Sequence, residues 1–190
     1  CYRSLRQHRR LWSSEVSMEV YDCIRSRRTV RNFKPDPVPD RVLNRILRAG
    51  RWAPSSSNVQ PWHFIVIKNP ATIQTMGGIA TQGTFLGQAP LAIAIVMEEA
   101  ARPQLDAGRV IQQMELVAWS EGLGTCFVGL RAEEQQVALK ELLGIPSEME
   151  LITILPFGYR EEGFAGRGVP RKSMAEIAHS EKFGQSYTTA

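Results

Sequence analysis

The sequence predicts a single α+β domain. Four continuous apolar runs of strand length are interspersed with segments in which apolar residues recur every three or four positions. No internal repeat, low-complexity tract or linker divides the chain, and 43% hydrophobic with 22% charged residues among 190 is typical of one compact domain. We therefore predict one domain over residues 18–190, preceded by an N-terminal extension of residues 1–17.

Two helices separated by prolines begin the predicted domain. Ser17 is expected to cap a first helix that presents Val20, Tyr21 and Ile24 on one face. The segment "KPDPVPD" then interrupts helical structure, because proline lacks an amide hydrogen. Asp40 is expected to cap a second helix, whose core face contains Val42, Leu43, Ile46, Leu47 and Ala53.

Two apolar runs, "WHFIVI" and "LAIAIVM", predict the first strands of the sheet. Neither alternates apolar with polar residues, so we expect both strands to be covered on both faces. "TCFVGL" and "LITILPFGY" predict the third and fourth strands, with Pro156 near the end of the last. The sequence therefore predicts a central sheet flanked by helices.

Two further helices are predicted from their apolar spacing. "EEQQVALKELLG" is typical of a short helix that stops at Gly144. A Gly- and Arg-rich loop, "YREEGFAGRGVPRK", follows the last strand. The other helix, over about residues 103–121, has a broad apolar face and is expected to be central: Ala107, Val110, Ile111, Met114, Val117 and Ala118.

The net charge of +4 is concentrated at the N-terminus. Four arginines against one glutamate leave +3 in residues 1–17, so residues 18–190 carry only +1. Without a basic stripe interleaved with aromatic residues, the domain is not expected to bind nucleic acid. We predict that residues 1–17 are disordered or carried over from expression, with Met18 as a natural start; a targeting peptide or a nucleic-acid-binding arm is the alternative.

Several functional classes are disfavoured by what the chain lacks. No apolar stretch approaches the roughly 20 residues of a membrane span, and the N-terminus does not resemble a secretory signal. Cys1, Cys23 and Cys126 are few and widely spaced, which predicts reduced thiols and a cytoplasmic protein. Cys126 lies in an apolar strand, where a buried, inert thiol is expected.

Metal and hydrolase chemistry are also disfavoured. The three histidines, His8, His63 and His179, have no ligand spacing, so we predict no metal site. His63 follows Trp62 in a predicted strand and is expected to be a core residue. The serines at 55–57 lack the Gly-x-Ser-x-Gly turn of a hydrolase nucleophile.

Three polar clusters interrupt this core pattern. "RSRRTVR" places several arginines and a hydroxyl after the first helix, "PSSSN" precedes a strand, and Arg171 with Lys172 follows the Gly-rich loop. Each has an ordinary structural explanation: a solvated basic face at a helix end, a loop of turn-forming residues, and an exposed basic pair. The functional alternative is phosphate recognition by guanidinium groups, together with a rigid loop on which a flat polar ligand can dock.

Taken together, these clusters resemble the FMN-dependent nitroreductase family, in the same order across nearly all of residues 18–179. "SRRTVRNF" is similar to that family's Arg-Arg-Ser-Val-Arg-x-Phe motif, with Thr29 in place of serine, and "APSSSNVQPWHF" is similar to its Pro-Ser-x-x-Asn-x-Gln-Pro-Trp loop. "GLGTCFVG" resembles the stretch that passes the flavin edge, and "PRKSMAEIAH" resembles the closing basic segment.

The resemblance implies a nitroreductase-like fold with a mainly antiparallel sheet, in an intertwined homodimer with FMN at the subunit interface. Arg27, Arg28 and Thr29 would hold the phosphate and ribityl chain together with Arg171 and Lys172. The partner subunit would cover the ring with its "PSSSN" loop. The remaining implied contacts are Arg31 at the pyrimidine edge, Gln82, the backbone of Val128 and Gly129, and, from that loop, Pro54, Ser55, Ser56 and Asn58.

The implied activity is electron transfer from NAD(P)H to a nitroaromatic, quinone or similar flat oxidant by a ping-pong mechanism. The flavin itself carries this chemistry, so no catalytic side chain is expected beyond Arg31, whose charge near N1 and O2 would favour the reduced flavin. The short connection between "LAIAIVM" and "PQLDAGRV" lacks the lid helix of larger members and predicts broad oxidant acceptance. The alternatives are a flavin-sequestering protein or a specialised activity such as reductive dehalogenation.

Overall fold

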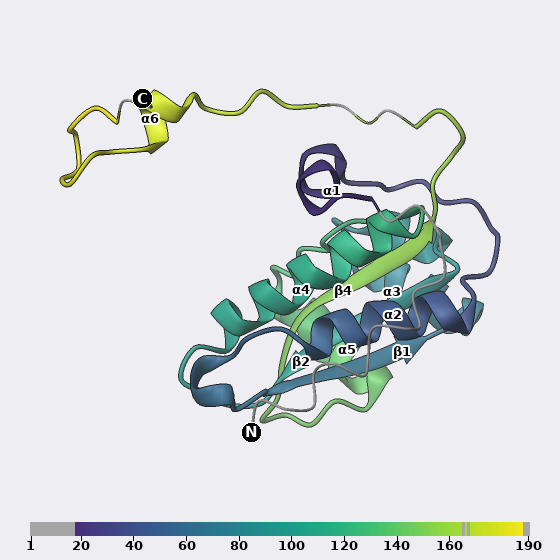
Figure 1. Cartoon of the computed structure of the whole chain (residues 1–190). Coiled ribbons are helices and arrows are strands. Elements are labelled where there is room, and N and C mark those ends of the chain that lie inside the picture. Colours follow the sequence, from purple (N-terminus) through teal and green to yellow (C-terminus); the bar gives the residue numbers. More distant parts are fainter. Residues whose placement is uncertain (1–17, 165, 167, 188–190) are drawn as a thin grey trace, which may run out of the picture.

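A four-stranded antiparallel sheet in the order β1-β2-β4-β3 lies at the centre of the fold (Figure 1). The computed structural model describes residues 18–164, 166 and 168–187. The strands are β1 (Trp62–Ile67), β2 (Leu91–Met97), β3 (Leu123–Thr125) and β4 (Glu150–Tyr159). The helices are α1 (Val20–Ser26), α2 (Asp40–Arg51), α3 (Pro70–Ile79), α4 (Pro103–Ser120), α5 (Glu133–Leu143) and α6 (Met174–Ile177), with short 3-10 helices η1 (Ser56–Asn58) and η2 (Thr84–Gln88).

Strand β2 is the centre of the core, because all seven of its residues are buried. It pairs with β1 from Ala92, opposite Ile67, to Met97, opposite Trp62, and it pairs with β4 on its other side. The pairing with β4 shifts register just after Ile95. The prediction of a strand covered on both faces is therefore confirmed for "LAIAIVM".

Two apolar clusters cover the two faces of the sheet, and β2 contributes to both by alternation. Leu91, Ile93, Ile95 and Met97 pack in the cluster shared with α2 and α4. The intervening residues of β2 pack in the cluster shared with α3 and α5. The result is a three-layer fold with a helix pair on each face (Figure 1), which confirms the predicted α+β class and the predicted covering of the sheet by helices.

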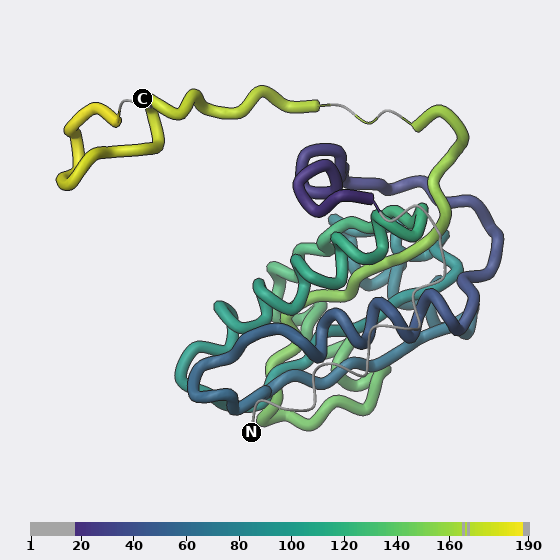
Figure 2. The backbone as a smooth tube through the Cα atoms, viewed as in Figure 1, coloured from purple at the N-terminus to yellow at the C-terminus, as the bar shows by residue number. Residues whose placement is uncertain are grey.

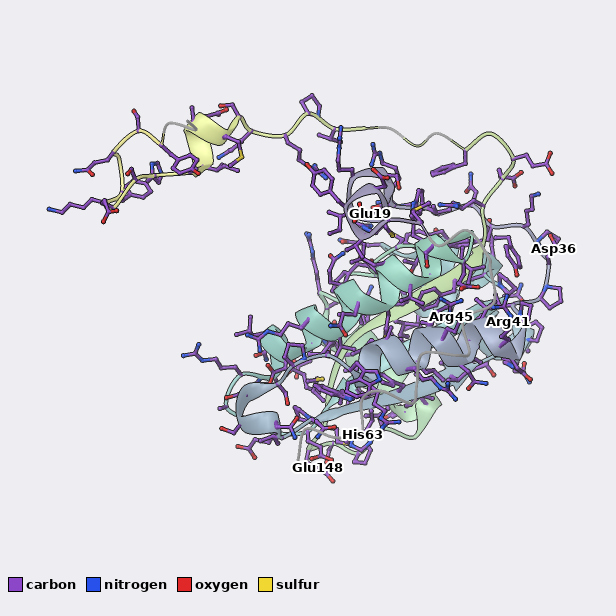
Figure 3. The ribbon with its side chains drawn as sticks, viewed as in Figure 1. Glu19, Asp36, Arg41, Arg45, His63 and Glu148 are labelled. Atoms are coloured by element: carbon purple, nitrogen blue, oxygen red, sulfur yellow. The ribbon has the colours of Figure 1, made fainter. Side chains whose placement is uncertain are left out.

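An ionic contact joins α2 to the end of α4. Arg45 Nη1 lies 2.6 Å from Glu121 Oε1, and Arg41 Nη2 lies 3.6 Å from Glu121 Oε2. Figure 3 labels both arginines on α2. Glu121 is the C-cap residue of α4, and its side chain is only 9% exposed. Both helices are thereby held in register over one face of the sheet.

The two N-terminal helices differ in detail from the prediction. Glu19, rather than Ser17, caps α1: its side chain accepts hydrogen bonds from two amides of the first turn. Ser17 and the predicted extension of residues 1–17 lie outside the described residues. The predicted apolar face of α1, Val20, Tyr21 and Ile24, is exposed, because in this chain only Cys23 faces the core.

The cap of α2 was also predicted wrongly. Pro39 occupies the N-cap position, and Asp40 is the first helical residue, whose carboxylate pairs with Lys68 on the neighbouring segment. The predicted core face of α2 is confirmed: Val42, Leu43 and Ile46 are buried and Leu47 packs partly against them. Ala53 is buried too, although it lies beyond the end of the helix.

Strand β1 is less buried than its apolar sequence predicts. It lies at the edge of the sheet, and four of its six residues are partly or fully exposed. His63 is one of them, and its Nε2 lies 2.7 Å from Glu98 Oε1, so the prediction of a core histidine is wrong. Figure 3 shows His63 at the outer side of the sheet.

The third strand is shorter and earlier than predicted. Strand β3 spans Leu123–Thr125 and pairs with the end of β4. The following residues, Cys126 to Leu130, are mostly buried but do not join the ladder. Instead the hydroxyl of Thr153 on β4 bonds the backbone of Val128, which replaces strand pairing with a side-chain bridge.

Helix α3 was not predicted, although its start carries a clear signal. Asn69 caps it by accepting hydrogen bonds from the amides of Ala71 and Thr72, at 2.9 and 3.2 Å. Pro70 occupies the first helical position, where its missing amide hydrogen costs nothing. The helix is rich in Thr and Gly, which weakens the apolar periodicity on which the prediction depended.

The C-terminal segment leaves the sheet after β4 and extends away from it (Figures 1 and 2). Figure 1 shows α6 apart from the helices and the sheet. Apolar side chains on this segment are exposed, including Met174 and Ile177 on α6 and Phe183, at 93%. None of the helices in the described ranges has the length and apolar character to cross a membrane.

Candidate functional site

The segment that follows α1 is fixed to the sheet through its backbone. The amide of Val30 donates a hydrogen bond of 3.0 Å to the carbonyl of Thr125 at the end of β3. Val30 is buried directly on Gly124, where even a methyl group would overlap its side chain. The neighbouring arginines and Thr29 are therefore presented from a rigid backbone.

Arg27 meets a buried carboxylate on the central helix. Its Nη1 lies 3.6 Å from Glu115 Oε2, and the Glu115 side chain is 10% exposed. Burial raises the pKa of Glu115, and the charge of Arg27 lowers it by less. Glu115 therefore offers Arg27 a counter-ion that is itself unfavourably desolvated.

Arg28 is folded back against its own chain and the C-terminal loop. Its Nη1 donates hydrogen bonds to the carbonyls of Arg25 and Arg27, at 2.6 and 3.0 Å. A methyl group at Gly166 would lie 2.6 Å from Arg28 Cγ, so the loop packs closely against it. Arg28 Nε is buried and has no hydrogen-bond partner in the part of the chain that the structure describes, which is unusual for a charged donor.

Arg31 is exposed and lies near the 3-10 helix η2. Its guanidinium carbon is 5.6 Å from the centre of the Phe85 ring. It also lies beside Cys126: burial raises the pKa of the Cys126 thiol, and the Arg31 charge lowers it by less. A buried thiol with a raised pKa agrees with the predicted inert role of Cys126.

The stretch after β3 joins the same end of the domain. The amide of Val128 donates to Thr153 Oγ1 at 3.2 Å, and Thr153 Oγ1 donates to the Val128 carbonyl at 2.9 Å. Gly83 packs so closely on Val128 that a methyl group there would lie 2.6 Å from it. Gln82, next to Gly83, is thereby brought to the stretch that contains Val128 and Gly129.

The "PSSSN" loop, which precedes β1, has an unusual backbone. Ser57, Asn58 and Gln60 have φ values of 49°, 57° and 56°, in the left-handed region that non-glycine residues seldom adopt. The loop closes on itself, because Ser55 Oγ accepts the amide of Gln60 at 2.9 Å and Ser55 O accepts the amide of Asn58 at 3.1 Å.

A buried carboxylate joins this loop to the central helix. Asp106 Oδ2 accepts the amide of Ser56 at 3.2 Å, and Asp106 Oδ1 accepts Arg109 Nη1 at 2.9 Å. Pro54 borders an open groove of about 440 Å³ along α4, lined also by Leu105, Gly108 and Gln112. The loop therefore lies beside the first turns of α4.

The structure brings some predicted site residues together and keeps others apart. Arg27 to Arg31, Gln82, Val128 and Gly129 lie at one end of the domain. The loop of Pro54 to Asn58 contacts α4 nine residues before Glu115, about 14 Å along the helix axis. Figure 1 shows α1 and η1 at different ends of the fold.

The closing basic pair is not near either group within this chain. Arg171 and Lys172 are exposed and immediately precede α6, which Figure 1 shows apart from the body.

The unpartnered atoms at the arginine end are suited to an anion. Arg28 Nε carries positive charge, and Thr125 Oγ1, also buried without a partner, can donate a hydrogen bond. Guanidinium groups match phosphate oxygens well, so these residues fit the phosphate of FMN. Among the described residues, no group of three or more His, Cys, Asp or Glu side chains could hold a metal ion.

Three residues of structural importance to this site were not predicted. Asp106 and Glu115 are isolated acidic residues on an amphipathic helix, a pattern that indicates a solvated face. Thr153 lies inside an apolar strand, and a β-branched hydroxyl there is ordinary. A signal for Asp106 was available only in its position in the first turn of a helix that starts with proline.

Comparisons with known proteins identify relatives across most of the chain. The sequence model of the family described as Nitroreductase family matches this chain over residues 24–98 and 80–159. A protein provisionally named NADH dehydrogenase/NAD(P)H nitroreductase from Archaeoglobus fulgidus is 30% identical over 155 residues, which cover 76% of this chain and 87% of the relative. An FMN-dependent nitroreductase from Clostridium difficile is 27% identical with a TM-score of 0.76, covering 85% of this chain and 98% of that one. Oxidised iodotyrosine deiodinase bound to FMN and 3-iodo-L-tyrosine shares the fold, with 23% identity, a TM-score of 0.76, and coverage of 87% and 100%.

Proposed function

This chain belongs to the nitroreductase family, and we propose that it is an FMN-dependent oxidoreductase that transfers electrons from NAD(P)H to a flat oxidant. The oxidant class is nitroaromatic, quinone or similar, and the mechanism is ping-pong. The observation that supports the proposal is the rigid segment of Arg27 to Arg31, in which the buried Nε of Arg28 has no hydrogen-bond partner among the described residues. The C. difficile relative, which is 27% identical, is named as FMN-dependent.

Arg27, Arg28 and Thr29 would hold the phosphate and ribityl chain of FMN. A phosphate would give Arg27 a second anionic partner besides Glu115 and would offer an acceptor to the guanidinium group of Arg28. Thr29 is exposed beside them and supplies a hydroxyl. FMN, when bound, supplies the hydride and electron transfer, which needs no protein nucleophile or metal.

Arg31, Gln82 and Gly129 would contact the flavin ring in this proposal. Arg31 provides fixed positive charge at the pyrimidine edge, which favours the reduced flavin electrostatically. Val128 belongs to the same edge, but Thr153 already bonds its amide and its carbonyl, so Gly129 is the stronger candidate for a backbone contact.

The site is completed by a second copy of the chain, in an intertwined homodimer with FMN at the interface. The loop of Pro54, Ser55, Ser56 and Asn58 lies about 14 Å along α4 from the arginine end of its own chain, and a partner subunit brings it over the ring. The exposed apolar residues of α1 and α6 support this arrangement, because such surfaces mark association sites. Arg171 and Lys172, which are exposed just before α6, would join the phosphate contacts as the resemblance implies.

The face of a bound flavin would be open to several oxidants. Only residues 98–102 connect β2 to α4, which leaves no room for a lid helix. Broad acceptance of flat oxidants follows, because shape selection needs an enclosing wall. The proposal includes a cytoplasmic location, which the free thiols Cys23 and Cys126 support.

An anaerobic titration of purified protein with NADPH and then NADH, followed by visible flavin absorbance, tests the proposal. Bleaching of a yellow protein, and recovery with a quinone or nitroaromatic, is the expected result. A yellow protein that no nicotinamide reduces would instead indicate flavin storage. A strong preference for an iodinated phenol would indicate reductive dehalogenation, and a protein that cannot be loaded with FMN would refute the cofactor assignment.

The role of Arg27 is tested by Arg27→Ala against Arg25→Ala. Arg25 is exposed on α1 and stacks near Tyr21, so its loss is a matched removal of one arginine. Loss of charge-assisted bonds worth roughly 1.5–3 kcal/mol should weaken FMN binding about 10- to 100-fold for Arg27→Ala only. Equal affinity in both variants would remove Arg27 from the phosphate site.

A further inference from the structure

We infer that Asp106 is a positioning residue: its buried carboxylate, bridging Ser56 and Arg109, holds the "PSSSN" loop in the conformation that covers the flavin. This inference rests on the proposed function and adds to it a residue on α4 that does not belong to the resemblance motifs. Asp106 acts through the loop rather than by touching the cofactor. Cofactor affinity therefore depends on a hydrogen bond remote from the arginine segment.

The loop needs an anchor because its backbone conformation is intrinsically unfavourable. Ser57, Asn58 and Gln60 all have positive φ, and none of them is glycine. Left-handed conformations at such residues persist only where surrounding contacts maintain them. The loop also carries exposed side chains along its length, so burial of apolar groups supplies little support.

The bonds within the loop define its shape but do not place it. Ser55 bonds to Gln60 and Asn58, and Ser56 O accepts the amide of Val59 at 3.1 Å. All of these partners move together with the loop. The Ser56 amide is different, because its acceptor belongs to α4, a long helix packed on the sheet. Asp106 therefore connects the loop to the rigid part of the domain.

Asp106 is suited to this role by burial and by its two acceptor oxygens. The residue is 1% exposed, so water does not compete for its hydrogen bonds. One oxygen faces the Ser56 amide and the other faces Arg109, and both neighbours are donors. Arg109 also supplies the opposite charge that a buried carboxylate needs.

This donor arrangement makes Asp106→Asn a sharp test. Asparagine has nearly the same size, but it has one acceptor oxygen and one donor amide. Whichever way that side chain points, its donor meets either the Ser56 amide or the Arg109 guanidinium. A second change in the same chain, Arg109→Gln, removes the conflict. The glutamine oxygen accepts from the introduced asparagine, whose own oxygen stays available to the Ser56 amide. The double variant should therefore recover what the single variant loses.

The experiment compares the full chain with Asp106→Asn, the double variant with Arg109→Gln, and Asp40→Asn. Asp40 is a first-turn carboxylate on α2 that pairs with Lys68 at the surface, so it controls for loss of a helix-terminal charge. FMN affinity is measured by quenching of flavin fluorescence, and loop order by hydrogen exchange of residues 55–60 in the FMN-free protein. Circular dichroism checks folding of each variant.

We expect about 10-fold weaker FMN binding and faster exchange in the loop for Asp106→Asn, with most of both effects reversed in the double variant. Asp40→Asn should match the unmodified chain. Unchanged loop exchange and unchanged FMN affinity in Asp106→Asn would overturn the inference, as would a double variant no better than the single one.

Two further outcomes are informative. If the unmodified chain fails to bind FMN, the proposed function is wrong, yet loop exchange still decides whether Asp106 is the anchor. If Asp106→Asn does not fold, Arg109→Met replaces it, since that side chain is 41% exposed. Arg109→Met should accelerate loop exchange by removing the counter-ion, and no change there would contradict the inference.

Discussion

The loop of residues 54–58 and the segment of residues 27–31 are both held against α4 and the sheet, but in opposite ways. In the loop, polar groups bond to each other and to buried Asp106. In the arginine segment, the backbone is fixed through Val30, while Arg28 Nε has no partner. The loop therefore has a conformation fixed by hydrogen bonds, whereas the segment contains a charged group with an unpaired hydrogen-bond donor.

In the proposed site, this difference separates a region of fixed conformation from a region of available positive charge. A shape that must be maintained against unfavourable φ angles needs its hydrogen bonds satisfied internally. A charged side chain that would bind a ligand binds it more strongly when no internal counter-ion competes with the ligand for that charge. Glu115 is that competitor for Arg27, and burial weakens it by raising its pKa.

Among the variants that test this comparison, Gly124→Ala is expected to have the largest effect, a loss of folding stability. The new methyl group overlaps Val30, which seats the arginine segment, and such overpacking typically costs about 1–3 kcal/mol. Urea unfolding should show this loss, and hydrogen exchange in the loop of residues 54–58 should stay unchanged. Gly78→Ala is the control, because a methyl group at that exposed position in α3 meets nothing within 4 Å. Equal unfolding midpoints for the two variants would contradict the seating role of Gly124.

A smaller effect is expected from Ser55→Ala in the loop. It removes the hydroxyl that accepts the Gln60 amide, a bond worth about 1 kcal/mol, while the exposed amide regains water. Exchange of the Gln60 amide should rise several-fold, with little change in the global unfolding midpoint. Ser57→Ala leaves this bond in place and serves as the control; equal exchange in both would show that the loop does not depend on Ser55.

The smallest expected effect is on the pH dependence of folding stability, through the side chain of Glu115. Because its pKa is raised in the folded protein, Glu115 favours folding at low pH, and this contribution is lost as pH rises through the raised pKa. Glu115→Gln should therefore be at least as stable as the unmodified chain at pH 7. That advantage should shrink as pH falls toward the ordinary pKa of 4.5. Urea midpoints from pH 5 to 8 measure it, and an advantage that grows on acidification would contradict the assignment.

Much of the fold could be predicted because its central elements have unambiguous patterns. Strand β2 is an uninterrupted apolar run, and α4 has a wide apolar face, so both were expected in the core and both lie there. Helix α3 was missed because Thr and Gly dilute its periodicity, although Asn69 and Pro70 mark its start. Strand β3 was misplaced because the apolar residues 126–130 are mostly buried without joining the ladder, and the backbone of Val128 bonds to the side chain of Thr153 instead.

Candidate site residues could be identified from the sequence only where they form a local motif. The arginines of residues 27–31 and the loop of residues 54–58 are contiguous in sequence, and the resemblance locates them. Asp106 and Glu115 act across long sequence separations, and a single acidic residue on a helix carries no signal of burial. The sequence places Val20, Tyr21 and Ile24 on one face of α1, but spacing alone does not show whether that face is buried, and all three side chains are exposed.

Helix α4 sets the distance, within one chain, between the loop of residues 54–58 and the arginine segment of residues 27–31. Asp106 and Glu115 lie on one unbroken helix, so the spacing and relative rotation of the loop and the arginine segment are set by nine residues of regular geometry. One inserted residue between them would turn one end by about 100° relative to the other. An insertion in α4 between Asp106 and Glu115 is therefore expected to disturb both contacts, whereas an insertion in the connection of residues 98–102 would leave the spacing between them unchanged.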